Sequence, residues 1–300
     1  MTWVNAALLS SATMGVVSII DSHLISKRMP SLGSYLIPAG AVTLICGFII
    51  LKLFPLPADV ATLPILLALA SGIIRTIAIT IVLYTLQKEE VSKVIPVIHT
   101  YPIFVAILAA LTLSEALDWT QWLAIVITVA GAVLVSLNRT PNTSKLKVGK
   151  SFGYLFGASA LLGIANTISK YTLDYISAWN LYSLTTFCMV GVFLVLFLRP
   201  KVFHELRGMK NPRSAMSLIV GNETLVLVSM ILFFWAVERG PVSLVSTINT
   251  ARPVFVFFYA VVLSRLSPVL LEWHLSKETI ALRGISVAMI VAGITLVSLY

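Results

Sequence analysis

Ten long apolar stretches constrain what this chain can fold into. They lie at about 3–24, 34–54, 63–86, 91–113, 119–138, 153–173, 178–199, 214–237, 242–264 and 280–299. A helix of about 20 residues is long enough to cross the ~30 Å of hydrocarbon in a bilayer. Hydrophobic residues make up 58% of the 300 residues and charged residues only 11%, which leaves too little polar surface for a water-soluble globule. We therefore expect an all-α integral membrane protein with ten transmembrane helices.

The two halves of the sequence repeat each other. The segment EEVSKVIPVIHTYPIF at 89–104 matches GPVSLVSTINTARPVF at 240–255 with an offset of 151 residues. Near the end of each half, VAGAVLVSL at 129–137 matches VAGITLVSL at 291–299 at seven of nine positions, with an offset of 162. The larger offset implies an insertion of 11 residues in the second half, and the segment 264–279 is where it fits.

A polar linker, NRTPNTSKLKVGK at 138–150, separates the halves, so we predict one repeat at 1–139 and another at 150–300. Because each repeat holds an odd number of helices, the two repeats must cross the membrane in opposite directions. Inverted repeats of this kind are characteristic of secondary transporters, whose substrate site lies near the midplane where the repeats meet.

The basic residues are distributed unequally between the two ends of the predicted helices. The loops that follow the first, third, fifth, seventh and ninth helices carry 16 of the 21 Lys and Arg. The positive-inside rule then places these loops in the cytoplasm and both termini outside a cell membrane, plasma or inner. We therefore interpret the net charge of +9 as attraction to anionic cytoplasmic lipid rather than to nucleic acid.

The sequence carries no pattern typical of a cofactor, a metal site or ATP hydrolysis. Neither a Cys/His ligand spacing nor a Walker A segment occurs in it. We expect no cofactor, no bound metal and no enzymatic activity, and energy drawn from an ion gradient or from the substrate gradient itself.

The segment VIPVIHTYPIFVAILAALTLSEALDWTQWLAIVITVAGAVLV at 94–135 resembles the end of an EamA domain. It has a helix with a central proline, an acidic turn that begins at Glu115, and a final helix with an Ala-Gly pair. A second copy spans roughly 152–300, where Lys277 stands in place of the glutamate. The resemblance implies a ten-helix member of the drug/metabolite transporter superfamily, which includes exporters of amino acids and other metabolites. Members of that family usually have cytoplasmic termini, the opposite of the orientation that the basic residues predict.

Two charges lie inside predicted transmembrane helices. They are Arg75 and Glu223, and the offset of 151 maps Glu223 onto Gly72, one helical turn from Arg75. Charges within the membrane generally mark substrate or ion pathways. We predict that both face a central cavity, where they pair with each other or bind the opposite charges of a zwitterion such as an amino acid. The alternative is an ion pair that only fixes helix packing.

Further polar and aromatic residues are candidates for the same cavity. For substrate binding they are His99, Asn249, Arg252, Asn166, Tyr84 and Trp235, and for proton coupling Asp21 together with Glu223. His99 could instead relay protons or be a hydrogen-bonded neutral side chain. Asp21 is also explained by solvation near a helix end, and Tyr84 and Trp235 by an interfacial aromatic belt.

Prolines and glycines supply the remaining predictions. Pro102 and Pro253 occupy equivalent positions in the two repeats and are expected to act as paired hinges, although a kink without motion is the alternative. The small residues Gly15, Gly163, Gly131 and Gly293 are expected to allow close helix packing.

These features together predict a secondary transporter that works by alternating access. Its substrate would be a small polar or zwitterionic metabolite. The chain would export it as a monomer, with protons as a candidate coupling ion. The alternatives are a flippase for a lipid or other amphipath, a multidrug exporter and, least favoured, an intramembrane enzyme.

Overall fold

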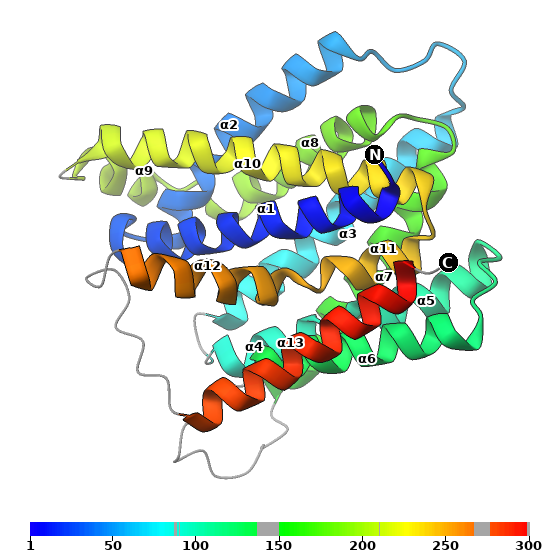
Figure 1. Cartoon of the computed structure of the whole chain (residues 1–300). Coiled ribbons are helices and arrows are strands. Elements are labelled where there is room, and N and C mark those ends of the chain that lie inside the picture. Colours follow the sequence, from blue (N-terminus) through cyan, green and yellow to red (C-terminus); the bar gives the residue numbers. More distant parts are fainter. Residues whose placement is uncertain (87–88, 90, 137–149, 210, 267–276, 299–300) are drawn as a thin grey trace.

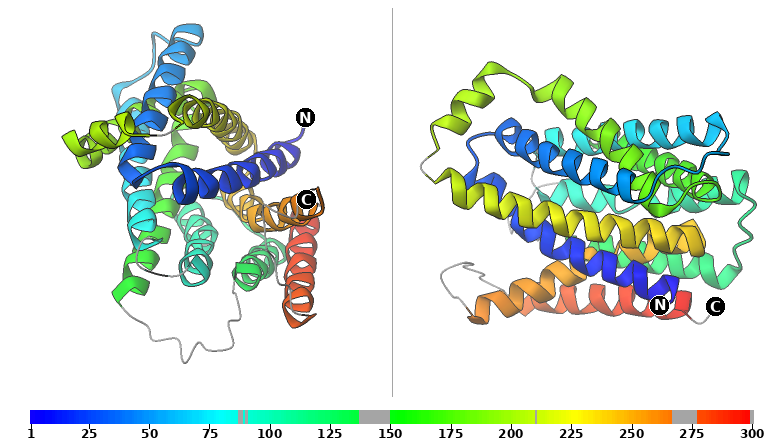
Figure 2. Two further views of the ribbon diagram at one scale, coloured as in Figure 1. Left: turned by 90° about the vertical axis from the view of Figure 1, so that its left-hand side faces the viewer. Right: turned by 90° about the horizontal axis from the view of Figure 1, so that it is seen from above.

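The computed structural model describes residues 1–86, 89, 91–136, 150–209, 211–266 and 277–298, and within these ranges it contains helices and no strand. The helices are α1 (Trp3–His23), a π-helical turn η1 (Leu24–Arg28), α2 (Leu32–Leu53), α3 (Thr62–Leu86), α4 (Val91–Ile98), α5 (Tyr101–Thr112), α6 (Trp119–Ser136), α7 (Lys150–Leu173), α8 (Ala178–Phe197), α9 (Pro200–Arg207), α10 (Pro212–Arg239), α11 (Val242–Asn249), α12 (Arg252–Leu266) and α13 (Lys277–Ser298). The two chain termini lie at the same end of the bundle (Figure 1). A view along the bundle and one from above are given in Figure 2.

Seven helical segments are long and apolar enough to cross a membrane, among the residues described. They are Trp3–Arg28, Leu32–Leu53, Thr62–Leu86, Val94–Thr112, Ser151–Leu173, Ala178–Phe197 and Pro212–Arg239. Helices α6 and α13 hold shorter apolar segments, Trp119–Leu134 and Gly284–Val297, and the ninth predicted stretch is divided between α11 and α12. The all-α membrane class is therefore confirmed, whereas a count of ten spans stays a prediction.

The fourth and ninth apolar stretches are each broken at equivalent positions. Helix α4 ends at Ile98 and α5 begins at Tyr101, while α11 ends at Asn249 and α12 begins at Arg252. Both pairs of positions differ by the offset of 151 residues that the sequence predicts. The predicted hinge prolines, Pro102 and Pro253, are the second residues of α5 and α12.

Each proline removes one backbone donor from its helix. As a result, the carbonyl four residues earlier loses its usual partner, and these carbonyls belong to Ile98 and Asn249. The hydroxyl of Ser159 on α7 donates to the Ile98 carbonyl at 3.4 Å, and that of Ser11 on α1 donates to the Asn249 carbonyl at 3.3 Å. The first helix of each predicted repeat thus supports the broken helix of the other repeat.

Glycines let these helices approach closely. A Cβ added at Gly15 on α1 would lie 3.0 Å from Cβ of Phe255, and one at Gly163 on α7 would lie 2.6 Å from Cβ of Phe104. Phe104 and Phe255 again differ by 151 positions. Gly131 on α6 and Gly293 on α13 meet the facing helix in the same way, so glycine packing is confirmed at all four positions.

Two segments singled out in the sequence are largely absent from the described ranges. The linker at 138–150 lies outside them except for Lys150, and so do residues 267–276 of the predicted insertion. The short helix α9 between α8 and α10 was not predicted, because its eight residues carry no long apolar run.

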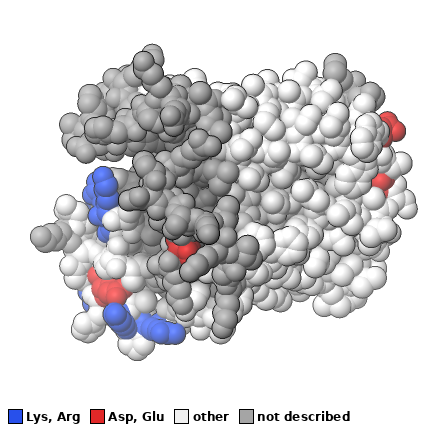
Figure 3. All heavy atoms as spheres, turned by 90° about the horizontal axis from the view of Figure 1, so that it is seen from below, with Lys and Arg blue, Asp and Glu red and all other residues white. Residues whose placement is uncertain are grey.

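The basic side chains seen in Figure 3 lie at the end of the molecule opposite the two termini, whereas acidic side chains appear at both ends. This is the end where η1, α9 and the start of α10 carry their Lys and Arg. The charge asymmetry of the loops is therefore also an asymmetry between the two ends of the bundle.

A test of the glycine contacts is Gly163→Ala. Its new Cβ must displace Phe104, and overpacking of this kind costs roughly 1–3 kcal/mol, so the midpoint of thermal unfolding in detergent should fall. Gly157→Ala on the same helix is the matched control, because no atom lies within 4 Å of its added Cβ. Equal midpoints for both variants would contradict the packing described here.

Candidate functional site

Polar side chains within the bundle form three groups, which we name by their chemistry. The carboxyl cluster consists of Asp21, Tyr35, Asn222 and Glu223; the arginine cluster of Arg75, Asn166, Ser169, Phe233 and Phe234; and the helix-break cluster of His99, Tyr101, Ser246, Asn249 and Arg252. Their backbones belong to α1, α2, α3, α5, α7, α10, α11 and α12 and to the break between α4 and α5.

The carboxyl cluster is held together by one phenol and one amide. The Tyr35 hydroxyl lies 2.5 Å from Oδ1 of Asp21 and 3.4 Å from Oε1 of Glu223. Nδ2 of Asn222 donates to Oδ1 of Asp21 at 2.7 Å and to the Tyr35 hydroxyl at 3.2 Å. Glu223 is only 6% exposed and Asn222 is fully buried. Two carboxyl groups from different helices therefore share one enclosed network.

The arginine cluster is the environment of Arg75. Nη2 of Arg75 donates to Oδ1 of Asn166 at 2.7 Å and contacts Oγ of Ser169 at 3.5 Å. The guanidinium carbon lies 6.0 Å and 5.5 Å from the ring centroids of Phe233 and Phe234, within the range of cation–π attraction. Hydrogen bonds and aromatic faces thus replace part of the hydration that this charge would have in water.

The helix-break cluster is held by the hydroxyl of Tyr101. The Tyr101 hydroxyl donates to the Ser246 carbonyl at 3.1 Å and accepts from Nδ2 of Asn249 at 3.3 Å. Tyr101 is close enough to interact electrostatically with both Arg75 and Arg252, and Arg252 interacts in the same way with Asp21. Electrostatic interactions therefore link the three clusters.

Several buried polar atoms of this region have no hydrogen-bond partner among the described residues. They are Nε of Arg75, Nδ1 of His99, Oδ1 of Asn222, Oγ of Ser246, Oδ1 of Asn249 and Nε of Arg252. Buried polar groups are normally paired, because leaving one unpaired costs ~1–3 kcal/mol. The concentration of unpaired donors and acceptors around the helix breaks marks where a polar ligand would find partners.

Most of the predicted site residues lie in these three clusters, but the two charges predicted within the helices do not meet. Arg75 and Glu223 belong to different clusters, so the predicted option of direct pairing is not what the fold has. Asp21 and Glu223 do share a cluster.

Two predicted aromatic residues lie elsewhere. Tyr84 is 58% exposed at the surface of the bundle. Trp235 packs its ring under the guanidinium of Arg239, 4.2 Å from the ring centroid, near the end of α10. Neither position supports a role in the central polar region.

Tyr35 is a member of the site that the sequence did not reveal. A tyrosine near the start of an apolar helix is common at membrane interfaces, and nothing in its neighbourhood distinguishes it. Its role depends on α1, α2 and α10 converging, which no local pattern records.

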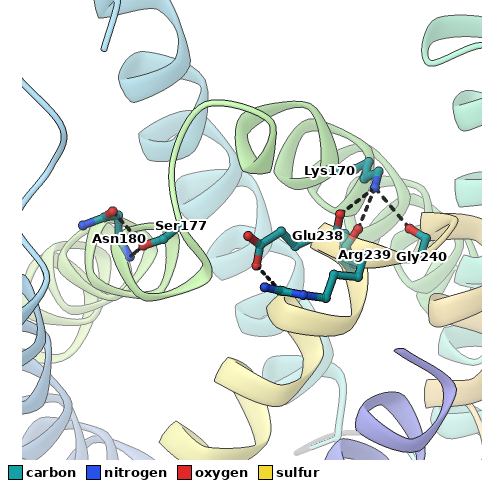
Figure 4. A network of polar contacts seen from close by, with 7 residues as sticks. Lys170, Ser177, Asn180, Glu238, Arg239 and Gly240 are labelled. Carbon is teal, nitrogen blue, oxygen red and sulfur yellow. Dashed lines mark hydrogen bonds and ion pairs between the residues drawn. The ribbon is translucent and has the colours of Figure 1, made fainter. Parts of the chain in front are cut away.

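The turn between α10 and α11 is held by two charged side chains from elsewhere in the chain. Nζ of Lys170 donates to the carbonyls of Val237, Glu238 and Gly240 at 2.8, 3.3 and 3.1 Å (Figure 4). The Glu115 carboxylate accepts from the amides of Val242 and Ser243 at 2.7 and 3.4 Å and from the Ser243 hydroxyl at 2.6 Å.

We call this arrangement the α10–α11 clamp. It places a cation on the carboxyl end of α10 and an anion on the amino end of α11, where the helix dipoles favour each charge. The predicted acidic turn at Glu115 thus has a structural partner in the second half of the chain.

Long apolar helices around a buried polar region define the class of this molecule as an integral membrane protein. The EamA-like transporter family matches residues 1–137, so an EamA-like domain spans the first half of the chain. This match confirms the resemblance inferred from residues 94–135.

One solved structure, described as "Crystal structure of protein", shares the fold of the whole chain. Its TM-score is 0.69 and its sequence identity 16%, with coverage of 99% of this chain and 95% of that chain. At this identity the likeness concerns the fold alone. Comparison with the curated proteins gives no match.

Replacing the central residue of the clamp tests its contribution to stability. Lys170→Met removes three hydrogen bonds from a charged donor, each worth up to ~3 kcal/mol when buried and less where water reaches it, so the thermal unfolding midpoint should fall. Lys201→Met is the control, because Lys201 on α9 is 85% exposed and makes only a 3.9 Å ion pair with Glu205. Equal stability of the two variants would show that the clamp contributes nothing.

Proposed function

We propose that this chain is a secondary transporter that exports a small polar or zwitterionic metabolite, such as an amino acid, by alternating access. The observation that carries the proposal is the set of buried donors and acceptors in the three clusters that have no partner among the described residues. The EamA-like domain supports transport, and the export direction follows from the resemblance to that family.

The charges of the polar region suit both ends of a zwitterion. Nε of Arg75 and Nε of Arg252 are free to donate to a carboxylate or another anionic group. Asp21 and Glu223 offer carboxyl oxygens to an ammonium group. Asn166, His99 and Asn249 would complete the site with hydrogen bonds of fixed direction.

The hydrogen bonding of the carboxyl cluster supports proton coupling. The single proton of Tyr35 can be donated to only one acceptor at a time. When it points to Asp21, a hydrogen bond between Tyr35 and Glu223 needs a proton on Glu223 itself. Release of that proton as substrate binds or leaves would couple proton movement to substrate movement, with Asp21 as the second acidic group.

The equivalent breaks at Ile98–Tyr101 and Asn249–Arg252 support the alternating-access part of the proposal. Inverted repeats that exchange conformations produce inward- and outward-open states around a fixed site. In this scheme Pro102 and Pro253 are the paired hinges, the repeats are 1–139 and 150–300, and the broken helices each count as one of ten spans. One chain holds both repeats, so a monomer suffices.

Uptake by proteoliposomes tests the substrate and the coupling ion together. With a panel of radiolabelled amino acids, the parent should show saturable uptake that an imposed pH gradient increases. Arg75→Gln should lower uptake at least tenfold, because a buried donor to the substrate is lost. Glu223→Gln should retain binding but lose the response to the gradient.

Lys201→Gln, an exposed change on α9, is the matched control and should transport like the parent. A folded parent that moves no amino acid would contradict the zwitterion proposal. Transport by both site variants at the parent rate would show that these charges only fix helix packing.

A second function, flipping of an amphipathic lipid, is favoured by one specific observation. A groove between α1 and α10 opens on the outer surface of the bundle and reaches Asn222 of the carboxyl cluster. Translocation of a fluorescent phospholipid, followed by dithionite quenching in the same proteoliposomes, separates the two functions. Quenching beyond the outer-leaflet fraction would favour the flippase.

The basic end of the bundle is proposed to face the cytoplasm of a cell membrane, with both termini outside. In bacterial cells, a C-terminal alkaline phosphatase fusion should be active and a C-terminal green fluorescent protein fusion dark. The same reporters inserted after Lys145 in the linker should show the reverse pattern. A fluorescent C-terminal fusion would invert the orientation and give the family's usual topology.

A further inference from the structure

The groove between α1 and α10 is a lateral recess in the surface of the bundle, with a volume of about 650 Å³. Polar residues line it near the basic end, and the remainder is lined by apolar residues together with Gly221 and Asn222. At the polar end are Arg28 of η1 and Ser214 and Ser217 of α10, and further along are Ile20, Leu218 and Leu225. The surface is thus amphipathic along its length.

The polar end presents a cation, Arg28, that has no carboxylate partner among the described residues. Nε of Arg28 donates to Nε2 of His23 at 3.2 Å, which fixes the plane of the guanidinium. In the described part of the chain the other nitrogens of Arg28 have no hydrogen-bond partner, and no carboxylate lines the groove. Ser214 and Ser217 are exposed and add hydroxyl donors beside this charge. A guanidinium flanked by hydroxyls is a common arrangement for binding phosphate.

The apolar part of the groove is open because Gly221 of α10 has no side chain to fill it. Gly221 lies between Leu218 and Leu225 on one face of the helix, and no atom is within 4 Å of a Cβ built on it. Ile20 forms part of the floor and also lines a second recess of about 440 Å³ between α1 and α12. The walls of that second recess are apolar and aromatic. Hydrocarbon chains are the expected occupants of such surfaces within a bilayer.

We propose that the groove binds an anionic phospholipid, with the phosphate at Arg28, Ser214 and Ser217 and an acyl chain along Leu218, Gly221 and Leu225. Charge complementarity favours an anionic lipid over a neutral one, since Lys27 and Arg213 adjoin the same end of the groove in sequence. The orientation proposed above places this end in the cytoplasmic leaflet, which is where anionic lipids concentrate.

A bound lipid at this place would cover the outer side of the carboxyl cluster. Asn222 is the residue that the groove and the cluster share, and its amide donates to Asp21. The proposal concerns binding and does not depend on transport of any solute.

Binding can be measured on the purified full chain in a neutral detergent. Titration with phosphatidylglycerol, followed by native mass spectrometry and by the thermal unfolding midpoint, should show a saturable complex and a higher midpoint. Arg28→Gln should weaken phosphatidylglycerol binding at least fivefold. Gly221→Leu should abolish it by filling the groove, and it should fold because the space beside Gly221 is open.

Lys201→Gln is the matched control for a lost positive charge at the same end of the bundle, and it should bind like the parent. Phosphatidylcholine and inorganic phosphate are the control ligands, and both should bind at least fivefold more weakly than phosphatidylglycerol. Equal binding of phosphatidylcholine would overturn the role of Arg28, and equal binding of phosphate would show a site for a soluble anion. Undiminished phosphatidylglycerol binding by folded Arg28→Gln and Gly221→Leu would place the lipid elsewhere and overturn the proposal.

Discussion

The hydrocarbon core of a bilayer offers no water to a backbone group that lacks a partner, and the rest of this structure depends on that constraint. It is most demanding where Pro102 and Pro253 interrupt helices in the interior. The carbonyls released there are met by serine hydroxyls of α7 and α1, which can approach because Gly163 and Gly15 lie one turn away on the same helices. The glycines that allow close helix packing therefore also allow the serine hydroxyls to reach these carbonyls.

Against this background the unpaired atoms stand out. The carbonyls of Ile98 and Asn249 have partners. The side chains of Arg75, His99, Asn249 and Arg252 each retain an atom without a hydrogen-bond partner among the described residues. Each buried polar atom without a partner lowers the stability of the fold, so stability alone does not explain why several lie in one region. This concentration of unpaired atoms supports the proposed ligand site. The α10–α11 clamp, in contrast, pairs its charges with backbone groups at two helix ends.

Much of the fold is predictable from the sequence because a membrane imposes simple patterns. The length of the apolar stretches predicts where the helices lie. The offset of 151 residues relates the break after Ile98 to the break after Asn249. Arg75 and Glu223 were conspicuous because charges are rare in such stretches. What could not be predicted is which neighbours they meet. The contact of Arg75 with Asn166 instead of Glu223 depends on the rotation and tilt of α3, α7 and α10, which hydropathy does not encode. The aromatic residues near helix ends, Tyr84 and Trp235, carried no signal that separates the outer surface from the interior.

The exchange of serine contacts between the halves also bears on how such a chain could have arisen. In each half, the carbonyl exposed by the proline is satisfied by the first helix of the other half. A single repeat by itself would thus leave a buried acceptor without a partner. In the proposed inverted arrangement, a second copy inserted in the opposite direction supplies the missing hydroxyl. An ancestral half-length chain with these features would have needed to insert in both directions and associate as an antiparallel pair. Gene fusion would then have joined two halves that already depended on each other's serine hydroxyls.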